Sequence, residues 1–113
     1  MAILHSAFLL LANWVCAKSP QPTISTFSIV ARDSKTGELG VAVQSKFVAV
    51  GSVVPYARAG IGAIASQAWG NPRYGPIGLE LLASGKSAME AVNLMTSADP
   101  HRNSRQLAII GAE

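Results

Sequence analysis

Alternating apolar and polar positions mark two neighbouring segments of the chain as β-strands. Residues 26–32 (TFSIVAR) and 39–47 (LGVAVQSKF) are rich in β-branched and aromatic residues, which favour extended backbone. Residues 33–38 (DSKTGE) lie between them and contain the Asp, Ser and Gly that are typical of turns. The pattern therefore predicts a β-hairpin that begins at Thr26.

The two faces of this hairpin follow from the period of two along a strand. The larger apolar side chains stand at positions 27, 29 and 31 of the first strand and at 39, 41, 43 and 47 of the second. Pairing these apolar faces places Gln44 and Lys46 on the face of Thr26, and a slip of one residue would exchange the faces. The predicted register thus gathers a hydroxyl, an amide and an ammonium group at the start of the hairpin.

Two further strands are indicated later in the chain. Residues 48–59 are apolar but are interrupted by Gly51 and Pro55, which indicates a loop that crosses the domain and leaves room for one short strand. A third strand is predicted over 61–67 and a fourth over 105–112, because both runs are apolar and rich in Ile and Ala.

Two helices are predicted between these strands. Pro76 suits the first turn of a helix, and Gly85 suits its end. Ser87 and Glu90 have the spacing of a capping box at the start of a second helix, which stops at residues 99–100 (DP). The apolar residues of both helices recur at helical spacing and are interpreted as core.

A glycine pattern leaves one alternative open. Residues 60–65 match the dinucleotide-binding pattern G-x-G-x-x-A, and Glu80 lies about 20 residues further on. In such proteins the glycines open a helix, whereas here Gly70 and Pro72 interrupt the chain soon afterwards. A strand is the preferred interpretation, and a protein that binds nicotinamide or flavin cofactors is the alternative.

The first 17 residues contain no Asp, Glu, Lys or Arg, and 14 of them are hydrophobic. With Val15 and Ala17 before a cleavage point, the segment is typical of a secretory signal peptide. Because His5 is its one side chain with basic character, a misassigned start and an uncleaved interfacial segment remain alternatives. Residues 18–25 contain two prolines and are interpreted as a linker or propeptide. We expect a secreted or periplasmic protein that meets the membrane only through its signal segment.

Charge and composition narrow the classes of function. The net charge is +3, but the nine basic residues are scattered and the seven aromatic residues do not interleave with them, so no nucleic-acid partner is expected. His, Cys and carboxylate residues are not clustered, so no metal is expected either. Between Glu38 and Glu80 there is no carboxylate, while Lys46, Arg58 and Arg73 fall there. These cations would favour an anionic ligand if they lined one cleft, and otherwise they keep an apolar region soluble.

The predicted elements do not complete a domain. A pair of sheets with apolar residues on both faces needs a covering layer on each side, which two helices cannot provide. The chain from Thr26 onwards has only 88 residues. We therefore expect an α+β fold in which residues 26–113 are a fragment of a larger domain.

A family resemblance extends these inferences. Residues 26–88 (TFSIVARDSKTGELGVAVQSKFVAVGSVVPYARAGIGAIASQAWGNPRYGPIGLELLASGKSA) and 98–112 (ADPHRNSRQLAIIGA) are similar to the N-terminal half of domain of unknown function 1028, a largely uncharacterised bacterial and archaeal family. The resemblance implies the four-layer αββα sandwich of N-terminal nucleophile (Ntn) hydrolases, incomplete in this chain. Some members carry a peptidoglycan-binding module after this domain, which implies a role in cell-wall metabolism.

The resemblance also implies a chemistry. In Ntn hydrolases the first residue of the first strand attacks an amide carbonyl, and its own α-amino group, with a pKa near 8, acts as the base. Thr26 occupies that position, and Lys46 would keep the amine unprotonated and stabilise negative charge. Ser25 precedes Thr26, so the amine is blocked unless the bond between them is cleaved.

The expected function follows from these assignments. Arg58, Gln67 and Gln44 are secondary candidates for holding a substrate carboxylate or amide, although the solvated structural role is the more common one for residues of this kind. We expect a secreted Ntn-type amidohydrolase that acts on a small-molecule or peptide-like amide, without metal or cofactor. The alternative is a non-catalytic protein of the same fold that binds a cell-wall or anionic small molecule. The oligomeric state stays open, a homo-oligomer included.

Overall fold

A computed structural model describes residues 25–113. The predicted signal peptide, residues 1–17, and nearly all of the predicted linker lie outside the described residues. The elements are β1 Thr26–Arg32, β2 Leu39–Ser45, β3 Pro55–Arg58, β4 Gly62–Ala68, α1 Tyr74–Ala83, α2 Ala88–Ser97 and β5 Arg105–Gly111, with short 3₁₀ turns at Val50–Ser52 and Arg102–Ser104. Among the described residues no helix is long and apolar enough to span a bilayer.

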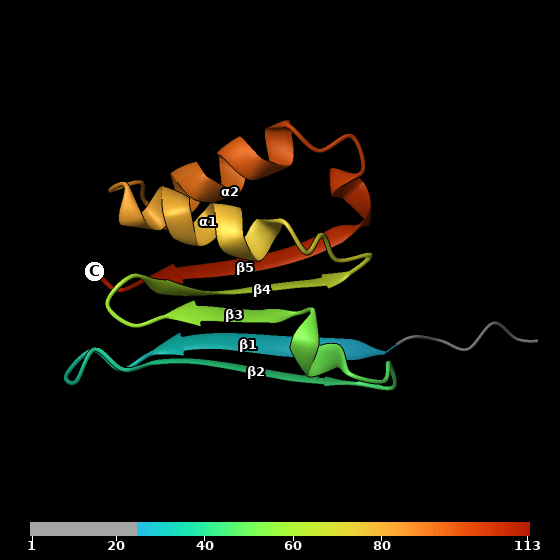
Figure 1. Cartoon of the computed structure of the whole chain (residues 1–113), viewed down its shortest axis with the longest axis horizontal. Coiled ribbons are helices and arrows are strands. Elements are labelled where there is room, and N and C mark those ends of the chain that lie inside the picture. Colours follow the sequence, from blue (N-terminus) through green and yellow to red (C-terminus); the bar gives the residue numbers. More distant parts are fainter. Residues whose placement is uncertain (1–24) are drawn as a thin grey trace, which may run out of the picture.

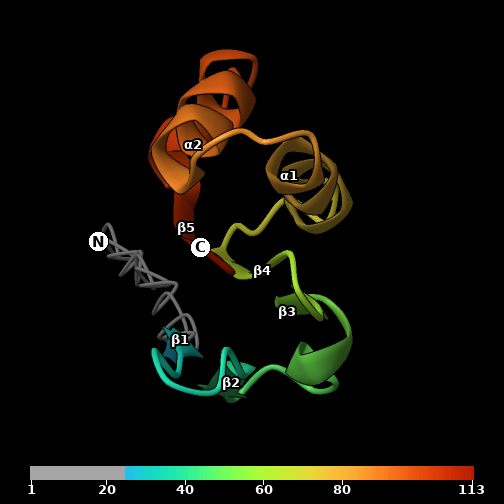
Figure 2. The same ribbon diagram turned by 90° about the vertical axis from the view of Figure 1, so that its left-hand side faces the viewer.

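The elements form three layers. Strands β1 and β2 make a two-stranded antiparallel sheet, and β3, β4 and β5 make a three-stranded antiparallel sheet with β4 in the middle. The β1–β2 hairpin packs on one face of the larger sheet, and α1 and α2 cover its other face (Figures 1 and 2). The predicted α+β class is confirmed as a small mixed domain of two sheets and two helices.

The core lies around β4, between the helices and the hairpin. Four consecutive residues of this strand, Ala63 to Ser66, are at most 1% exposed. Small residues in α1 allow the helix to approach the sheet closely. A Cβ atom on Gly78 would lie 2.5 Å from Ile64 Cδ1, and one on Gly75 would lie 2.1 Å from the Tyr56 ring.

The predicted helix boundaries are largely confirmed. Helix α1 begins at Tyr74, two residues before Pro76, and the chain leaves it through Gly85, whose φ of 86° suits glycine. The capping box of α2 is present, since the Ser87 hydroxyl accepts from Glu90 N and the Glu90 carboxylate accepts from Ser87 N.

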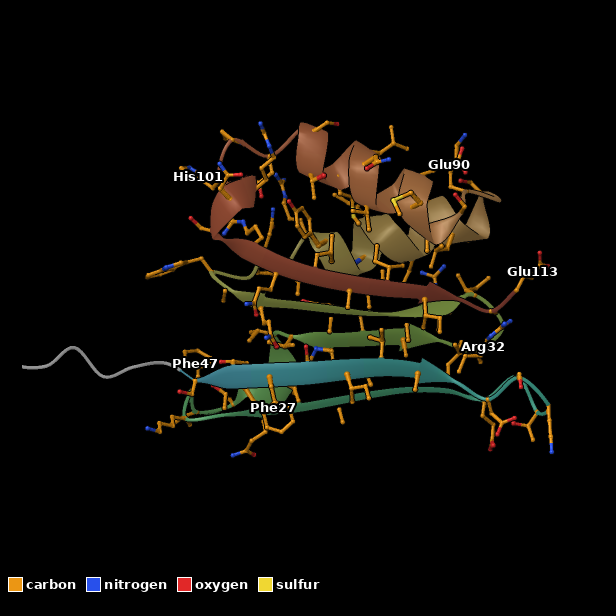
Figure 3. All side chains as sticks on the ribbon, turned by 180° about the vertical axis from the view of Figure 1, so that it is seen from behind. Phe27, Arg32, Phe47, Glu90, His101 and Glu113 are labelled. Carbon is orange, nitrogen blue, oxygen red and sulfur yellow. The ribbon has the colours of Figure 1, made fainter. Side chains whose placement is uncertain are left out.

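The hairpin register is shifted by one residue from the predicted one. Thr26 pairs with Ser45, and Phe27 pairs with Gln44. The inward face therefore carries Thr26 and Ser45, while Gln44 lies with Phe27 on the outer face. Phe27 is 66% exposed and points away from the larger sheet (Figure 3). The predicted placement of Gln44 and Lys46 on the face of Thr26 is wrong.

The loop between the strands explains this shift. Asp33 N donates to Glu38 O, and Gly37 N donates to Asp33 O, both at 2.9 Å. Asp33 Oδ1 also accepts from Lys35 N and Thr36 N. This closed loop makes Arg32 pair with Leu39, and loop geometry determines register when both strand faces carry apolar residues.

The dinucleotide-binding alternative is wrong. Gly60, at φ 69°, lies in a turn, and the residues after it form β4 rather than the start of a helix. Strand β4 runs antiparallel to both of its neighbours, whereas the dinucleotide motif requires a parallel strand–helix–strand unit.

Candidate functional site

Thr26 lies at the start of β1 with its hydroxyl in a defined position. Its Oγ1 is 2.8 Å from Ser45 Oγ, and Ser45 Oγ also accepts from Phe47 N at 3.0 Å. Both hydroxyls are half-buried on the inward face of the hairpin. The cross-strand pairing of Thr26 with Ser45 therefore orients the candidate nucleophile.

Gln67 holds this end of the hairpin to the larger sheet. It lies near the end of β4 and is 9% exposed. Its Nε2 donates to Thr26 O at 3.0 Å and to Gln106 Oε1 at 2.6 Å, on the neighbouring strand. Its own Oε1 is buried without a hydrogen-bond partner among the described residues. The two acceptors dictate this amide orientation, because the reverse orientation would leave both without a donor.

A pocket of about 300 Å³ opens beside Thr26. Apolar side chains make up most of its wall, and Phe47, one of them, lies beside the start of β1 (Figure 3). Its lining consists of Thr26, Phe47, Val50, Val53, Val54, Ser66, Gln67, Ala68, Trp69, Gly70, Pro72 and Arg105. The hairpin, the segment before β3, the end of β4 and the start of β5 each contribute to it.

The segment after β4 lines the pocket and is held by several hydrogen bonds. Ala68 has a φ of 64°, which is rare for a residue other than glycine. Trp69 N donates to Ser104 O, and the Arg105 guanidinium donates to Trp69 O. At Gly70 an added Cβ would lie 2.6 Å from Ser66 O, so this turn needs glycine. The wall beside the pocket is thus fixed to β5.

Arg105 is itself held in a partly buried charge network. Asp99 Oδ2 accepts from Arg105 Nε at 2.9 Å and from the Tyr74 hydroxyl at 2.8 Å, and Asp99 Oδ1 accepts from His101 N. These bonds, led by the one from Arg105, hold the pKa of Asp99 well below its usual range. Burial, followed by the bond to Asp99, raises the pKa of Tyr74. The Arg105 charge beside the pocket is therefore paired.

The structure brings together only part of the predicted site. Thr26 and Gln67 line one pocket. Gln44 lies on the outer face of the hairpin, and Lys46 is an exposed residue that follows β2. Arg58 pairs with Gly62 at the opposite end of β4 and binds Glu80 at 2.7 Å. The three cations between Glu38 and Glu80 do not share a cleft with Thr26.

Sequence reasoning missed Ser45, Gln106 and the apolar wall. Ser45 would have followed from the correct register, because it then faces Thr26. Gln106 lies directly opposite Gln67, which a pairing of the last two predicted strands could have shown. No local signal marks Trp69 or Phe47 as pocket residues, since they come from separate loops. No three His, Cys, Asp or Glu residues within 25–113 are grouped so as to hold a metal ion.

Comparison with known proteins gives two positive findings. A family model described as a family of unknown function (DUF1028) matches residues 26–113. The crystal structure of protein SPO2555 from Silicibacter pomeroyi, also described as DUF1028, is similar with a TM-score of 0.74 and 36% sequence identity. The match covers 80% of this chain and 40% of that one, so this chain spans less than half the length of its solved relative. No match was found among curated proteins.

Proposed function

The chain belongs to the DUF1028 family, whose function is unknown, and from the pocket beside Thr26 we propose that it is a secreted Ntn-type amidohydrolase. Thr26 is the nucleophile, and its α-amino group, once free, is the base. One observation carries the proposal: the hydroxyl of the first residue of β1 is hydrogen-bonded to Ser45 at the wall of a pocket. A hydroxyl held in place at a concave site is what nucleophilic catalysis requires.

The proposed reaction has two stages. As Thr26 Oγ1 attacks the carbonyl carbon of the substrate amide, the free amino group takes the hydroxyl proton. The C–N bond then breaks, the amine leaves with that proton, and the acyl group remains as an ester on Oγ1. Water hydrolyses the ester to a carboxylic acid and regenerates the hydroxyl. The base exists only after cleavage of the bond between Ser25 and Thr26, and Ser25 is exposed.

Ser45 takes the place that the predicted register gave to Lys46. Its Oγ accepts from Phe47 N and shares a hydrogen bond with Thr26 Oγ1. We assign it as a positioning residue that orients the nucleophile. Lys46 receives no such assignment, because the register that placed it on the face of Thr26 is not the one observed.

The proposed architecture is the four-layer αββα sandwich, with a second helical layer on the outer face of the hairpin. The exposed outer face supports it, since Phe27 and Ile29 are 66% and 59% exposed. Apolar sheet faces are normally covered in domains of this kind. The three layers described above would then be the first part of the fold.

Mass spectrometry of the mature protein tests the first requirement of this function. The full-length protein, expressed with its signal segment, should begin at Thr26 when it is isolated in active form. An isolated protein that begins only at Lys18 would contradict the proposal, because Thr26 would then have no free amine.

Variants test the nucleophile itself. Hydrolysis of a panel of fluorogenic acyl-aminomethylcoumarin amides should be lost in Thr26→Ala. It should fall by about 10- to 100-fold in kcat, with little change in KM, in Ser45→Ala. Thr36→Ala is the matched control, since Thr36 lies in the exposed hairpin loop, and it should retain full activity. Full activity in Thr26→Ala would exclude the catalytic assignment.

The second candidate is a non-catalytic protein that binds a cell-wall or anionic small molecule. The observation that favours it is that Ser25 precedes Thr26, which makes the Thr26 nitrogen a peptide nitrogen in the uncleaved chain. The two candidates give opposite results in the mass spectrometry and in the amide hydrolysis assay.

A further inference from the structure

The wall of the pocket beside Thr26 is largely apolar. Phe47, Val53 and Trp69 are 54%, 38% and 74% exposed, and all three line it. Exposed large apolar side chains that gather at one concavity mark binding sites for apolar groups. Val50, Val54 and Pro72 extend this apolar wall, and Val54 is buried.

Most polar groups of the lining are engaged within the protein, and the exception, Gln67 Oε1, is a buried acceptor, which cannot donate to an anionic group. Ser66 Oγ accepts from Asn71 N, and both donors of the Gln67 amide go to Thr26 O and Gln106 Oε1. The Thr26 hydroxyl bonds to Ser45 and is the group that would react. The lining therefore offers few free hydrogen-bond partners to a charged or strongly polar substituent, which would lose its hydration on binding.

The one charge in the lining is balanced. Arg105 Nε donates to Asp99 at 2.9 Å, and the guanidinium also donates to Trp69 O. A carboxylate on a ligand would have to compete with Asp99 for Arg105 while losing its own hydration. Lys46, Arg58 and Arg73, the other cations of this region, are not among the residues of the lining.

We infer that the pocket accepts the uncharged, apolar acyl group of an amide substrate, with an aromatic or branched aliphatic side chain, and discriminates against anionic acyl groups. A volume of about 300 Å³ is enough for one such group. The inference rests on the proposed function, which makes this pocket the substrate site. It narrows the proposed substrate from any amide to amides with an uncharged, apolar acyl group.

Three matched probes test this preference by direct binding. Phenylacetamide carries the apolar group, 4-carboxyphenylacetamide adds a negative charge to it, and acetamide lacks it. Binding is followed by the indole N–H NMR signal of Trp69 in the full chain with Thr26→Ala, so that no turnover occurs. Phenylacetamide should bind at least about tenfold more tightly than either other probe. Equal or tighter binding of the charged probe, or of acetamide, would overturn the inference.

A pair of exposed phenylalanines provides the matched variants. Phe47→Thr should weaken phenylacetamide binding by about fivefold or more, because it removes pocket wall. Phe27→Thr should leave binding unchanged, since Phe27 is also exposed but lies on the outer face of the hairpin. Unchanged binding in Phe47→Thr would place the probe elsewhere and overturn the assignment.

The failures of the two proposals are separable. The expected probe order in Thr26→Ala, combined with absent hydrolysis and an uncleaved Ser25–Thr26 bond in the wild type, would remove the amidohydrolase and keep the apolar pocket. A mature Thr26 terminus and hydrolysis that favours anionic acyl groups would keep the amidohydrolase and remove the apolar preference.

Discussion

The three-stranded sheet and the β1–β2 hairpin lie face to face, but they differ in how they are covered. Strand β4 lies between helices and hairpin, and Ile64 is fully buried. The hairpin is covered on one face within the described residues, and Ile29 is 59% exposed on the other. The candidate site joins the two sheets, because Thr26 comes from the hairpin and Gln67 from β4. Substitutions in the buried part of the three-stranded sheet should therefore lower the free energy of unfolding, whereas substitutions on the outer face of the hairpin should change it little.

The largest effect is expected at Ile64. Ile64→Ala removes side-chain atoms from a fully buried position between β4 and α1 and should lower the free energy of unfolding by about 3 kcal/mol. Urea denaturation monitored by circular dichroism measures this change. Ile29→Ala is the matched control on the outer face and should cost less than about 1 kcal/mol. Equal losses at both positions would show that the two sheets are covered alike.

Two glycine substitutions compare the close packing of α1 on the larger sheet with the open outer face of the hairpin. Gly75→Ala would place a Cβ atom 2.1 Å from the Tyr56 ring, so α1 must move away from β3. A loss of about 1–3 kcal/mol in the free energy of unfolding is expected from such overpacking. Gly40→Ala, on the outer face of the hairpin, meets nothing within 4 Å and should be neutral. Thermal denaturation of both variants measures these changes in stability, and a neutral Gly75→Ala would contradict the close packing of α1.

Much of the fold was predictable because its signals are local. The capping box at Ser87, the end of α1 at Gly85 and the strand start at Thr26 each depend on a few adjacent residues. The register of the hairpin was not predictable in the same way. Both of its faces carry apolar residues, so the difference between inward Val30 and outward Ile29 depends on the loop hydrogen bonds at Asp33.

The candidate site was predictable only where it depends on a strand end. Thr26 and Gln67 stand at strand ends, and the structure brings them to one pocket. The partners of these residues depend on pairings across strands, which the shifted register altered for Ser45 and Lys46. The apolar wall depends on two loops, one between β2 and β3 and one between β4 and α1, and no local sequence pattern predicts that they lie side by side.

The pH dependence of stability should separate Asp99, beside the larger sheet, from Asp33 in the hairpin loop. Because its hydrogen bonds lower the pKa of folded Asp99, the carboxylate stabilises the fold fully above the unfolded pKa of about 4. That stabilisation is lost as the pH falls below this value towards the folded pKa. Asp99→Asn should thus be less stable than the wild type at pH 7, with the difference shrinking below about pH 4.

Asp33→Asn is the control for this titration. Backbone N–H groups of Thr36 and Lys35 lower the pKa of Asp33, and an Asn side chain can accept the same bonds. Its stability difference from the wild type should therefore be smaller at pH 7 than that of Asp99→Asn. Denaturation midpoints between pH 2 and pH 7 check both variants, and identical profiles would contradict the role given to Arg105.

The smallest effect is expected on the outer face of the hairpin. Phe27→Thr places a β-branched residue, which suits a strand, in β1 and removes a ring that is 66% exposed, so the free energy of unfolding should change by about 0.5 kcal/mol or less. A loss of several times that free energy in the 113-residue chain would contradict the difference between the two sheets, because the Phe27 ring would then be buried against another surface. Measuring the loss at two protein concentrations tells which surface: a loss that grows with concentration identifies a second copy of the chain, since only intermolecular burial obeys mass action.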